Sequence, residues 1–299
     1  MTEEATLSDD VRGRLAAAGL DAGAVLALIA RAVDEDLDGG VDVTTVATVP
    51  VGQRATLDLV ARRAGVAAGV PVAAAVFDFV CGDDRVMQML VSDGTTVQPG
   101  DVLLSVSGST HDLLQAERPA LNLLCHLSGI ATLTRTWVDA IAGSSARIRD
   151  TRKTTPGMRR LEKYAVRCGG GVNHRMSLSD AALVKDNHVV AAGGVAAAFD
   201  AVRQRFPGVD VEVEVDSLDQ FDEVLEAGAD LVLLDNFPVD DLREAVARNR
   251  GRARLEASGG LSLDVAAEVA ATGVDYLAVG ALTHSAPVLD IGADLRQEA

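Results

Sequence analysis

The sequence predicts an α/β protein whose C-terminal half folds as an open, incomplete α/β barrel. Strand-like and helix-like segments alternate regularly from residue 146 onward, and each strand-like segment ends in polar side chains. Six such units in succession predict a parallel sheet covered by helices. A doubly wound sheet concentrates its chemistry at one switch point, whereas a barrel places it on the loop after every strand. The polar strand ends therefore favour a barrel, and six units rather than eight make it incomplete.

The N-terminal part predicts a mixed unit of helices and strands. Apolar residues recur at helical spacing over 9–33, and the acids, glycines and β-branched residues that follow predict a change from helix to strand. Short strand-like runs over 54–107 surround one helical stretch, VPVAAAVFDFV. Residues 111–143 form a long amphipathic stretch, expected as two helices with a break near 128–129. This stretch links the N-terminal unit to the barrel.

Composition excludes several classes of protein. The net charge of −17 over 299 residues argues against binding to nucleic acid or an anionic membrane, because the field of the protein would repel a polyanion. The three cysteines lack CxxC spacing, so neither disulfides nor a zinc site is expected. No signal-like run and no stretch of about 18 uncharged apolar residues is present. We therefore expect a soluble cytoplasmic enzyme.

Residues 149–188 form a cationic cluster in a chain that is acidic elsewhere. The cluster holds nine Lys and Arg against four acids, and it contains all three lysines of the chain. Four of the basic residues lie at helical spacing and are expected on a solvated helix face: Arg159, Arg160, Lys163 and Arg167. Another set sits at strand ends or in the loop GGGVNHR: Arg152, Lys153, His174, Arg175 and Lys185. This second set predicts a binding site for more than one carboxylate or phosphate.

Two later strands carry acids toward the same edge of the predicted sheet. In VEVEVDS the valines take one face and the acids the other, although a parallel strand should be apolar on both faces. Inward acids need a metal, cations or protons to offset their desolvation. Glu214 is expected to reach a ligand, and either Glu212 or Asp216 could assist it. Asp235, at the end of LVLLD, is expected to hold Mg²⁺ or to stabilise developing positive charge rather than to cap the next helix.

The loops after the last two strands predict a phosphate site. ASGG and VGALTHS supply backbone N–H groups and hydroxyls, and barrels commonly bind phosphate on these loops. The candidate residues are Ser258, Gly259, Gly260, Gly280 and His284.

Eight blocks in one order resemble the quinolinate phosphoribosyltransferase family. They are ERPALNLLCHLSGIAT, DTRKTTPGMR, EKYAVRCGGGVNHR, LVKDNH, VEVEVDS, LDNF, EASGG and VGALTHS. The resemblance covers nearly the whole chain. It implies an N-terminal α/β sandwich domain over 1–117, joined by the C-terminal tail 285–299, and an open α/β barrel with the active site over 118–284. It also implies a homodimer in which Arg118 reaches the partner's site.

By the same resemblance, the protein is a pentosyltransferase of NAD biosynthesis. Quinolinate and 5-phosphoribosyl-1-pyrophosphate (PRPP), with Mg²⁺ as cofactor, would give nicotinate mononucleotide, pyrophosphate and carbon dioxide. The roles that the resemblance implies are quinolinate binding by Arg118, Arg152, His174, Arg175 and Lys185, catalysis by Lys153, Glu214 and Asp235, the last two also near Mg²⁺, and 5-phosphate binding by Ser258, Gly259, Gly260, Gly280 and His284.

Two other functions fit parts of the pattern. A related phosphoribosyltransferase, acting on nicotinate or associated with molybdenum uptake, would share the phosphate loops and the barrel. Five carboxylate-binding cations favour a dicarboxylate substrate instead. A non-catalytic sensor of a phosphometabolite would have little use for Lys153 and the acidic strand ends.

Overall fold

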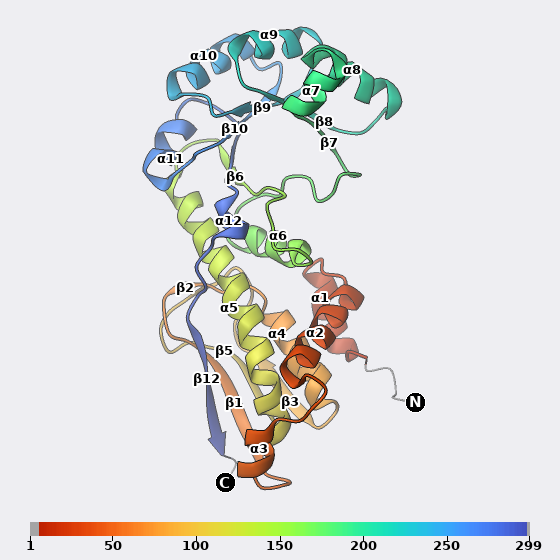
Figure 1. The fold of residues 1–299 in the computed structure, drawn as a ribbon. Helices are drawn as coiled ribbons and strands as arrows, with labels where there is room; N and C mark the ends of the chain where they lie inside the picture. The colour runs from red at the N-terminus through yellow and green to blue at the C-terminus, as the bar shows by residue number, and fades with distance from the viewer. Residues whose placement is uncertain (1–5, 298–299) are drawn as a thin grey trace. The chain divides into compact units, whose positions relative to one another are not determined.

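The computed structural model describes residues 6–297, which divide into two compact units (Figure 1). The first unit comprises the residues up to Leu133, Arg160–Gly169, and the residues from Ala286 onward. The second comprises Thr134–Arg159 and Gly170–Ser285. The expected boundary at residue 118 differs from this division, which falls inside the helix α5 (Thr110–Ala140). Because α5 runs without interruption for 31 residues, no turn signal marks the boundary in the sequence.

The first unit is built around a four-stranded antiparallel sheet in the order β12-β1-β5-β3. The C-terminal strand β12 (Ile291–Gln297) pairs antiparallel with β1 (Arg54–Ala61), so the tail of the chain belongs to this sheet. The apolar helix α4 (Val70–Cys81) packs against β3 and β5. The remaining elements of this unit are α1 (Asp9–Ala17), α2 (Ala22–Leu37), α3 (Val43–Thr48), β2 (Gly65–Val66), β3 (Arg85–Met89), β4 (Thr96–Val97), β5 (Val102–Ser109) and most of α6 (Arg159–Cys168).

Two local predictions for the first unit are wrong. The segment after residue 42 forms the short helix α3 rather than a strand, because the Asp42 carboxylate accepts hydrogen bonds from the backbone N–H groups of Thr44 and Thr45. The expected break near residues 128–129 is absent from α5. Gly129 is needed there for close packing, since a Cβ atom would collide with the carbonyl oxygen of Pro287.

On helix α6 the prediction of a solvated basic face holds for Arg160 and Arg167, which are exposed, but is wrong for Lys163. Lys163 and Glu162 are fully buried, as are most of their neighbours on this helix. The Glu162 carboxylate lies 2.9 Å from His126 Nε2, and the Tyr164 hydroxyl donates to Asp93 at 2.6 Å. Such tertiary partners allow polar side chains to be buried, and helical periodicity cannot show that they exist.

The second unit contains six parallel strands in the order β6-β11-β10-β9-β8-β7. The first two strands, β6 (Arg147–Arg149) and β7 (Ala182–Val184), lie at opposite edges of this sheet. Within the described residues no pairing joins them, so the barrel is open at this point. The other strands are β8 (Val211–Val215), β9 (Leu231–Asp235), β10 (Arg254–Ser258) and β11 (Tyr276–Ala278).

Helices connect these strands and surround the sheet in the manner that a parallel arrangement requires. They are α7 (Asp186–Ala192), α8 (Val195–Arg205), α9 (Leu218–Glu226), α10 (Val239–Asn249), α11 (Leu263–Ala270) and α12 (Ala281–His284). Six strands in this order confirm the α/β class and the open barrel.

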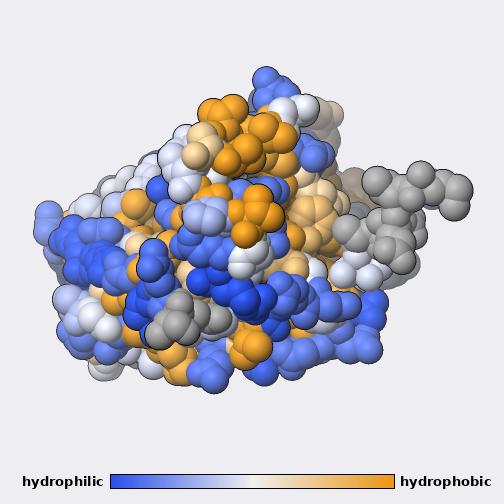
Figure 2. Space-filling view, turned by 90° about the horizontal axis from the view of Figure 1, so that it is seen from below, coloured by the Kyte–Doolittle hydropathy of each residue, from blue (hydrophilic) through white to orange (hydrophobic). Residues whose placement is uncertain are grey.

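Viewed from below, Figure 2 shows separate hydrophobic patches among hydrophilic residues. Among residues 6–297, no single helix is long and apolar enough to cross a membrane, and α1 with α2 meets the length and composition test only as a pair bent by 113°.

Candidate active site

A cavity of about 630 Å³ lies at the C-terminal ends of the strands of the second unit. It is lined by Thr151, Arg152, Lys153, His174, Arg175, Leu183, Lys185, Glu214, Leu233, Asp235, Asn236, Glu256, Ser258, Gly259, Gly260 and Ala278. Of the thirteen site residues expected from the sequence, three are outside this lining: Arg118, Gly280 and His284. Parallel strands bring their carboxyl ends to one edge, which explains why side chains so far apart in sequence meet here.

Gly280 lies next to the cavity, close to the Lys153 side chain on one side and to His284 on the other. A Cβ atom on Gly280 would lie 3.1 Å from the Lys153 Cδ atom and 3.3 Å from His284 Nε2. The Thr283 hydroxyl donates to the Lys153 carbonyl at 2.7 Å. The loop after β11 therefore holds Lys153 in place. Arg118 belongs to α5 in the first unit, and its side chain is 62% exposed.

Arg152 and Arg175 place two guanidinium groups in the lining of the same cavity. Arg175 donates from Nη1 to the Ala181 carbonyl at 2.9 Å, but the buried Nε atoms of both arginines have no hydrogen-bond partner. Burial and the neighbouring charge of Arg152 lower the pKa of Arg175. A bound anion would supply the missing acceptors and relieve the repulsion between the two cations.

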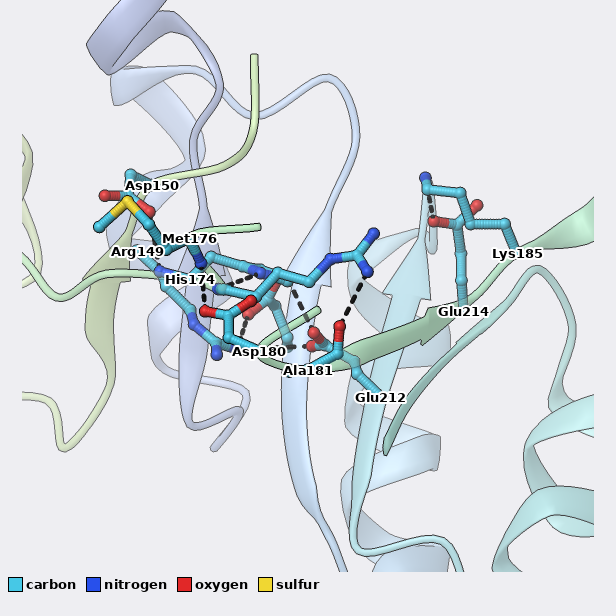
Figure 3. A network of polar contacts seen from close by, with 11 residues as sticks. Arg149, Asp150, His174, Met176, Asp180, Ala181, Lys185, Glu212 and Glu214 are labelled. Atoms are coloured by element: carbon cyan, nitrogen blue, oxygen red, sulfur yellow. Dashed lines mark hydrogen bonds and ion pairs between the residues drawn. The ribbon is translucent and has the colours of Figure 1, made fainter. Parts of the chain in front are cut away.

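Lys185 and Glu214 form an ion pair at the side of the cavity. Their Nζ and Oε2 atoms are 2.8 Å apart, and Figure 3 shows this pair separate from the arginine and histidine cluster. The Asp235 carboxylate accepts a hydrogen bond from the Asn236 side chain at 2.7 Å. Glu214 and Asp235 supply the hard oxygen donors that Mg²⁺ prefers. These two strand-end residues are the ones that could hold a magnesium ion.

The glycine loop after β10 is built against the end of β9. Asn236 has a φ of 57°, and its backbone N–H donates to the Ser258 carbonyl at 2.8 Å. Gly259 has a φ of 90°, and a Cβ atom there would collide with the Asn236 side chain. Only glycine combines this backbone conformation with this close approach. Ser258, Gly259 and Gly260 of this loop line the cavity.

Substitution Gly259→Ala should destabilise the chain more than Gly260→Ala. Both glycines have a positive φ, but space is open within 4 Å of Gly260. The backbone strain is shared by the two variants, at about 1 kcal/mol each, and the collision with Asn236 is added only at residue 259. Free energies of unfolding from urea titrations would measure the difference. Equal losses would show that Asn236 moves aside at no cost.

His174 belongs to a cluster of four charged or titratable side chains, with Arg149, Glu212 and Glu256, and the sequence prediction gave no role to Arg149 and Glu256. Arg149 Nη1 donates to Glu256 Oε2 at 2.5 Å and to Glu212 Oε1 at 3.4 Å. His174 Nε2 lies 2.7 Å from Glu212 Oε2. Figure 3 shows Arg149, His174 and Glu212 directed toward one another. Alternation along the strand RLEAS is the signal that could have identified Glu256, because it places Glu256 and Ser258 on one face.

The cluster fixes the state of His174. Its Nδ1 atom accepts a hydrogen bond from the Arg175 backbone N–H at 2.7 Å, so the ring proton lies on Nε2 and is donated to Glu212. Glu212 therefore contacts His174 and Arg149, while Asp216 is exposed and outside the cavity lining.

The same cluster contains a ligand set that a metal ion could use. Ligand atoms of His174, Glu212 and Glu256 lie within 4.8 Å of one another. Arg149 already places a positive charge between the two carboxylates, and burial of that guanidinium is offset by them. An arginine thus fills the place that a cation would take.

Glu256 should make the stability of the chain depend on pH. Burial, followed by the charge of Glu212, raises the pKa of Glu256 from 4.5 to about 8. The folded chain therefore keeps a proton that the unfolded chain releases between about pH 4.5 and 8. Wild-type stability, measured relative to Glu256→Gln, should fall across this window by a few kcal/mol at most. Parallel stability curves for the two proteins would contradict the raised pKa.

Two family models match this chain. "Quinolinate phosphoribosyl transferase, C-terminal domain" matches residues 130–294, and the N-terminal domain of the same family matches residues 42–128. The chain belongs to the quinolinate phosphoribosyltransferase family. Among relatives of this family, nicotinate-nucleotide pyrophosphorylase [carboxylating] of Mycobacterium leprae is 57% identical over 89% of this chain and 95% of its own length.

Solved structures of the family share the fold. NadC from Streptococcus pyogenes matches with a TM-score of 0.89 and 38% identity, covering 94% of this chain and 99% of that one. The nicotinate-nucleotide pyrophosphorylase from Francisella tularensis matches with a TM-score of 0.88 and 35% identity, covering 92% and 96% of the two chains. The family relationship thus extends over both units.

Proposed function

We propose that this enzyme transfers the phosphoribosyl group of PRPP to quinolinate and releases carbon dioxide, giving nicotinate mononucleotide and pyrophosphate for NAD biosynthesis. The observation that carries the proposal is the composition of the cavity. It combines two arginines whose buried Nε atoms have no hydrogen-bond partner with a lysine, the carboxylates of Glu214 and Asp235 and a glycine loop. Membership of the quinolinate phosphoribosyltransferase family supports the same activity. The reaction class is pentosyl transfer.

The two adjacent carboxylates of quinolinate match the cationic side of the cavity. Arg152, Arg175 and Lys185 would bind them by charge-assisted hydrogen bonds, and guanidinium groups can do so with two parallel bonds. Glu212 holds the His174 ring in one orientation, so His174 would contact quinolinate as part of the rigid wall of the cavity. Binding of quinolinate would satisfy the buried Nε atoms of both arginines.

Substitution Arg175→Ala should weaken quinolinate binding about 10- to 100-fold, because it removes one charge-assisted contact. The affinity for quinolinate would be measured by calorimetry in the absence of PRPP. Arg203→Ala, in the same unit but outside the cavity lining, serves as a control. An unchanged dissociation constant for Arg175→Ala would remove Arg175 from the quinolinate site.

The phosphoribosyl donor would occupy the opposite side of the cavity. Lys153 would neutralise the departing pyrophosphate, and Ser258, Gly259, Gly260, Gly280 and His284 would surround the 5-phosphate. Glu214 and Asp235 would hold Mg²⁺, which when bound neutralises phosphate charge and favours pyrophosphate departure. The same carboxylates would stabilise the positive charge that develops on the ribose carbon.

The chemical steps then follow from the charges of the substrate. The bond between the ribose carbon and pyrophosphate breaks, pyrophosphate leaves with the electron pair, and the pyridine nitrogen supplies the pair for the new bond. The ring nitrogen becomes positively charged, so it stabilises the electron pair left on C2 when the 2-carboxylate departs as carbon dioxide. That carbon then takes up one proton.

We also propose that the active enzyme is a homodimer in which Arg118 completes the quinolinate site of the partner subunit. Three observations support this assignment: Arg118 is exposed, the carboxylate of its chain neighbour Glu117 lies no closer than 4.0 Å, and Arg118 is outside the cavity lining of its own chain. Exposed valines on and near α3 offer apolar surface for subunit contact, namely Val41, Val43, Val46 and Val51. The cytoplasm is the proposed location, and the three cysteines are free thiols, as a reducing compartment would keep them.

The function is tested by product analysis. Purified protein incubated with quinolinate, PRPP and Mg²⁺ should release nicotinate mononucleotide, pyrophosphate and carbon dioxide in equal amounts. Omission of Mg²⁺ with a chelator present should stop product formation. Absence of nicotinate mononucleotide in the complete mixture would contradict the proposal.

A further inference from the structure

Glu256 is a carboxyl group at the inner end of the active-site cavity that the reaction described above does not use. Glu256 is among the residues that line the cavity, and its exposed fraction is 0%. It lies two residues before Ser258 on β10, and its register neighbour on β9 is Leu233, which lines the cavity two residues before Asp235. Side chains at this level are deeper in the barrel than the strand ends, on the same face.

One oxygen of Glu256 has no partner. Oε2 accepts the hydrogen bond of Arg149, whereas Oε1 is buried and makes no hydrogen bond. His174 Nε2 lies 3.8 Å from Oε1, too far for a hydrogen bond, and that atom donates its proton to Glu212. A buried carboxylate oxygen without a donor is costly, whereas a protonated oxygen becomes a donor that a ligand can satisfy.

The charges around Glu256 also favour a protonated carboxyl group. The charged or titratable groups that face Glu256 are Arg149 from β6, Asp150 just after it, His174, Glu212 from β8 and Tyr276, its register neighbour on β11. Among the described residues, Arg149 is the cation whose guanidinium contacts both Glu212 and Glu256, and it stacks on the Tyr276 ring at 4.8 Å. Glu212 accepts from both Arg149 and His174. With Glu256 protonated, Arg149 and Glu212 form a neutral pair, whereas a second negative charge on Glu256 would have no cation of its own.

From this geometry we infer that Glu256 is an uncharged hydrogen-bond donor at the inner end of the cavity, and that its Oε1–H group binds a carboxylate of quinolinate. The inference rests on the proposed function, which supplies the carboxylate. A neutral donor suits this position because a charged carboxylate would repel an anionic substrate. Burial and Glu212 raise the pKa of Glu256 to about 8, which agrees with a protonated group at neutral pH. The role of Glu256 is that of a specificity residue for anionic substrates.

Two substitutions of similar size separate the donor from the packing of Glu256. Glu256→Gln keeps an uncharged donor, and the KM for quinolinate should rise only about threefold at neutral pH. Glu256→Met removes the donor, and this KM should rise about 10- to 100-fold. The KM for PRPP should change less than the KM for quinolinate in both variants. Equal KM values for quinolinate in Glu256→Met and wild type would overturn the inference.

The pH profile adds a readout that a packing role would not change. In wild type, kcat/KM for quinolinate should fall above about pH 8, where Glu256 loses its proton. This component of the alkaline limb should be absent in Glu256→Gln, because an amide does not titrate. An identical alkaline limb in the two proteins would contradict the inference, and this comparison decides it if Glu256→Met does not fold.

Glu212 provides a matched control for the same chemical change. Its carboxylate accepts from both Arg149 and His174, so the amide of Glu212→Gln would direct a donor toward a donor. Glu212→Gln should therefore lower the unfolding midpoint more than Glu256→Gln. Equal midpoints would show that the proton is not localised on Glu256.

Infrared spectroscopy tests the protonated carboxyl without any substrate. Wild type at neutral pH should show a protonated-carboxyl band that is missing from the spectrum of Glu256→Gln. A spectrum without that band would overturn the inference even if quinolinate is turned over. Conversely, the band with no turnover of quinolinate would leave Glu256 protonated and refute the proposed function alone.

Discussion

Lys153→Met should reduce kcat about 10²- to 10³-fold while quinolinate still binds, because the ammonium neutralises charge that appears on the departing pyrophosphate. The cavity position of Lys153, its close approach to Gly280 and the hydrogen bond from Thr283 to its carbonyl support this role. Methionine keeps the aliphatic stem that packs on Gly280 and removes only the charge. Steady-state kinetics with PRPP and quinolinate would measure the loss.

The binding control for this variant is calorimetry with quinolinate alone, which should give a dissociation constant within about threefold of wild type, since Arg152 and Arg175 remain. Lys153→Arg keeps the charge but not the compact ammonium, and it should recover part of the activity. Wild-type kcat in Lys153→Met would refute the assignment of Lys153 to catalysis.

Arg118→Ala should lower kcat/KM for quinolinate about 10- to 1000-fold, because it removes a charge-assisted contact to a substrate carboxylate. Its exposed position makes a folding defect an implausible cause. The unfolding midpoint should therefore match that of wild type, which separates this loss from destabilisation.

Mixing two inactive variants tests whether Arg118 acts on the partner's site. Subunits with Arg118→Ala and subunits with Lys153→Met, exchanged in equal amounts, should regain about a quarter of wild-type activity. Half of the dimers would then be mixed, and each mixed dimer would contain one site with both residues intact. No recovery after proven subunit exchange would place Arg118 in the site of its own chain.

Most of the cavity could be predicted because its chemistry lies at the ends of apolar strands. Asp235 follows LVLL, and Ser258 precedes two glycines, so periodicity and composition locate these side chains at one edge of a parallel sheet. Alternation in VEVEV likewise predicts the inward face of Glu214. These signals are local in the sequence. They were sufficient because parallel strands bring all their carboxyl ends, and the side chains there, to one edge of the sheet.

Features that depend on distant partners could not be predicted in this way. The burial of Lys163 depends on how α6 is enclosed, and the continuity of α5 at Gly129 depends on the approach of residue 287. Strand formation was expected where the Asp42 cap instead starts α3, because one capping side chain outweighs the propensity of a few β-branched residues. The pairing of Arg149 with Glu256 joins segments 107 residues apart and leaves no local trace.

Substrate selectivity tests the central claim most directly, because the cationic side of the cavity is assigned to two carboxylates rather than one. With PRPP and Mg²⁺ present, kcat/KM should be measured for quinolinate and for nicotinate under identical conditions. Loss of one charge-assisted contact predicts at least about 100-fold higher kcat/KM for quinolinate. Equal or faster formation of nicotinate mononucleotide from nicotinate would contradict the assignment of this cavity to a dicarboxylate.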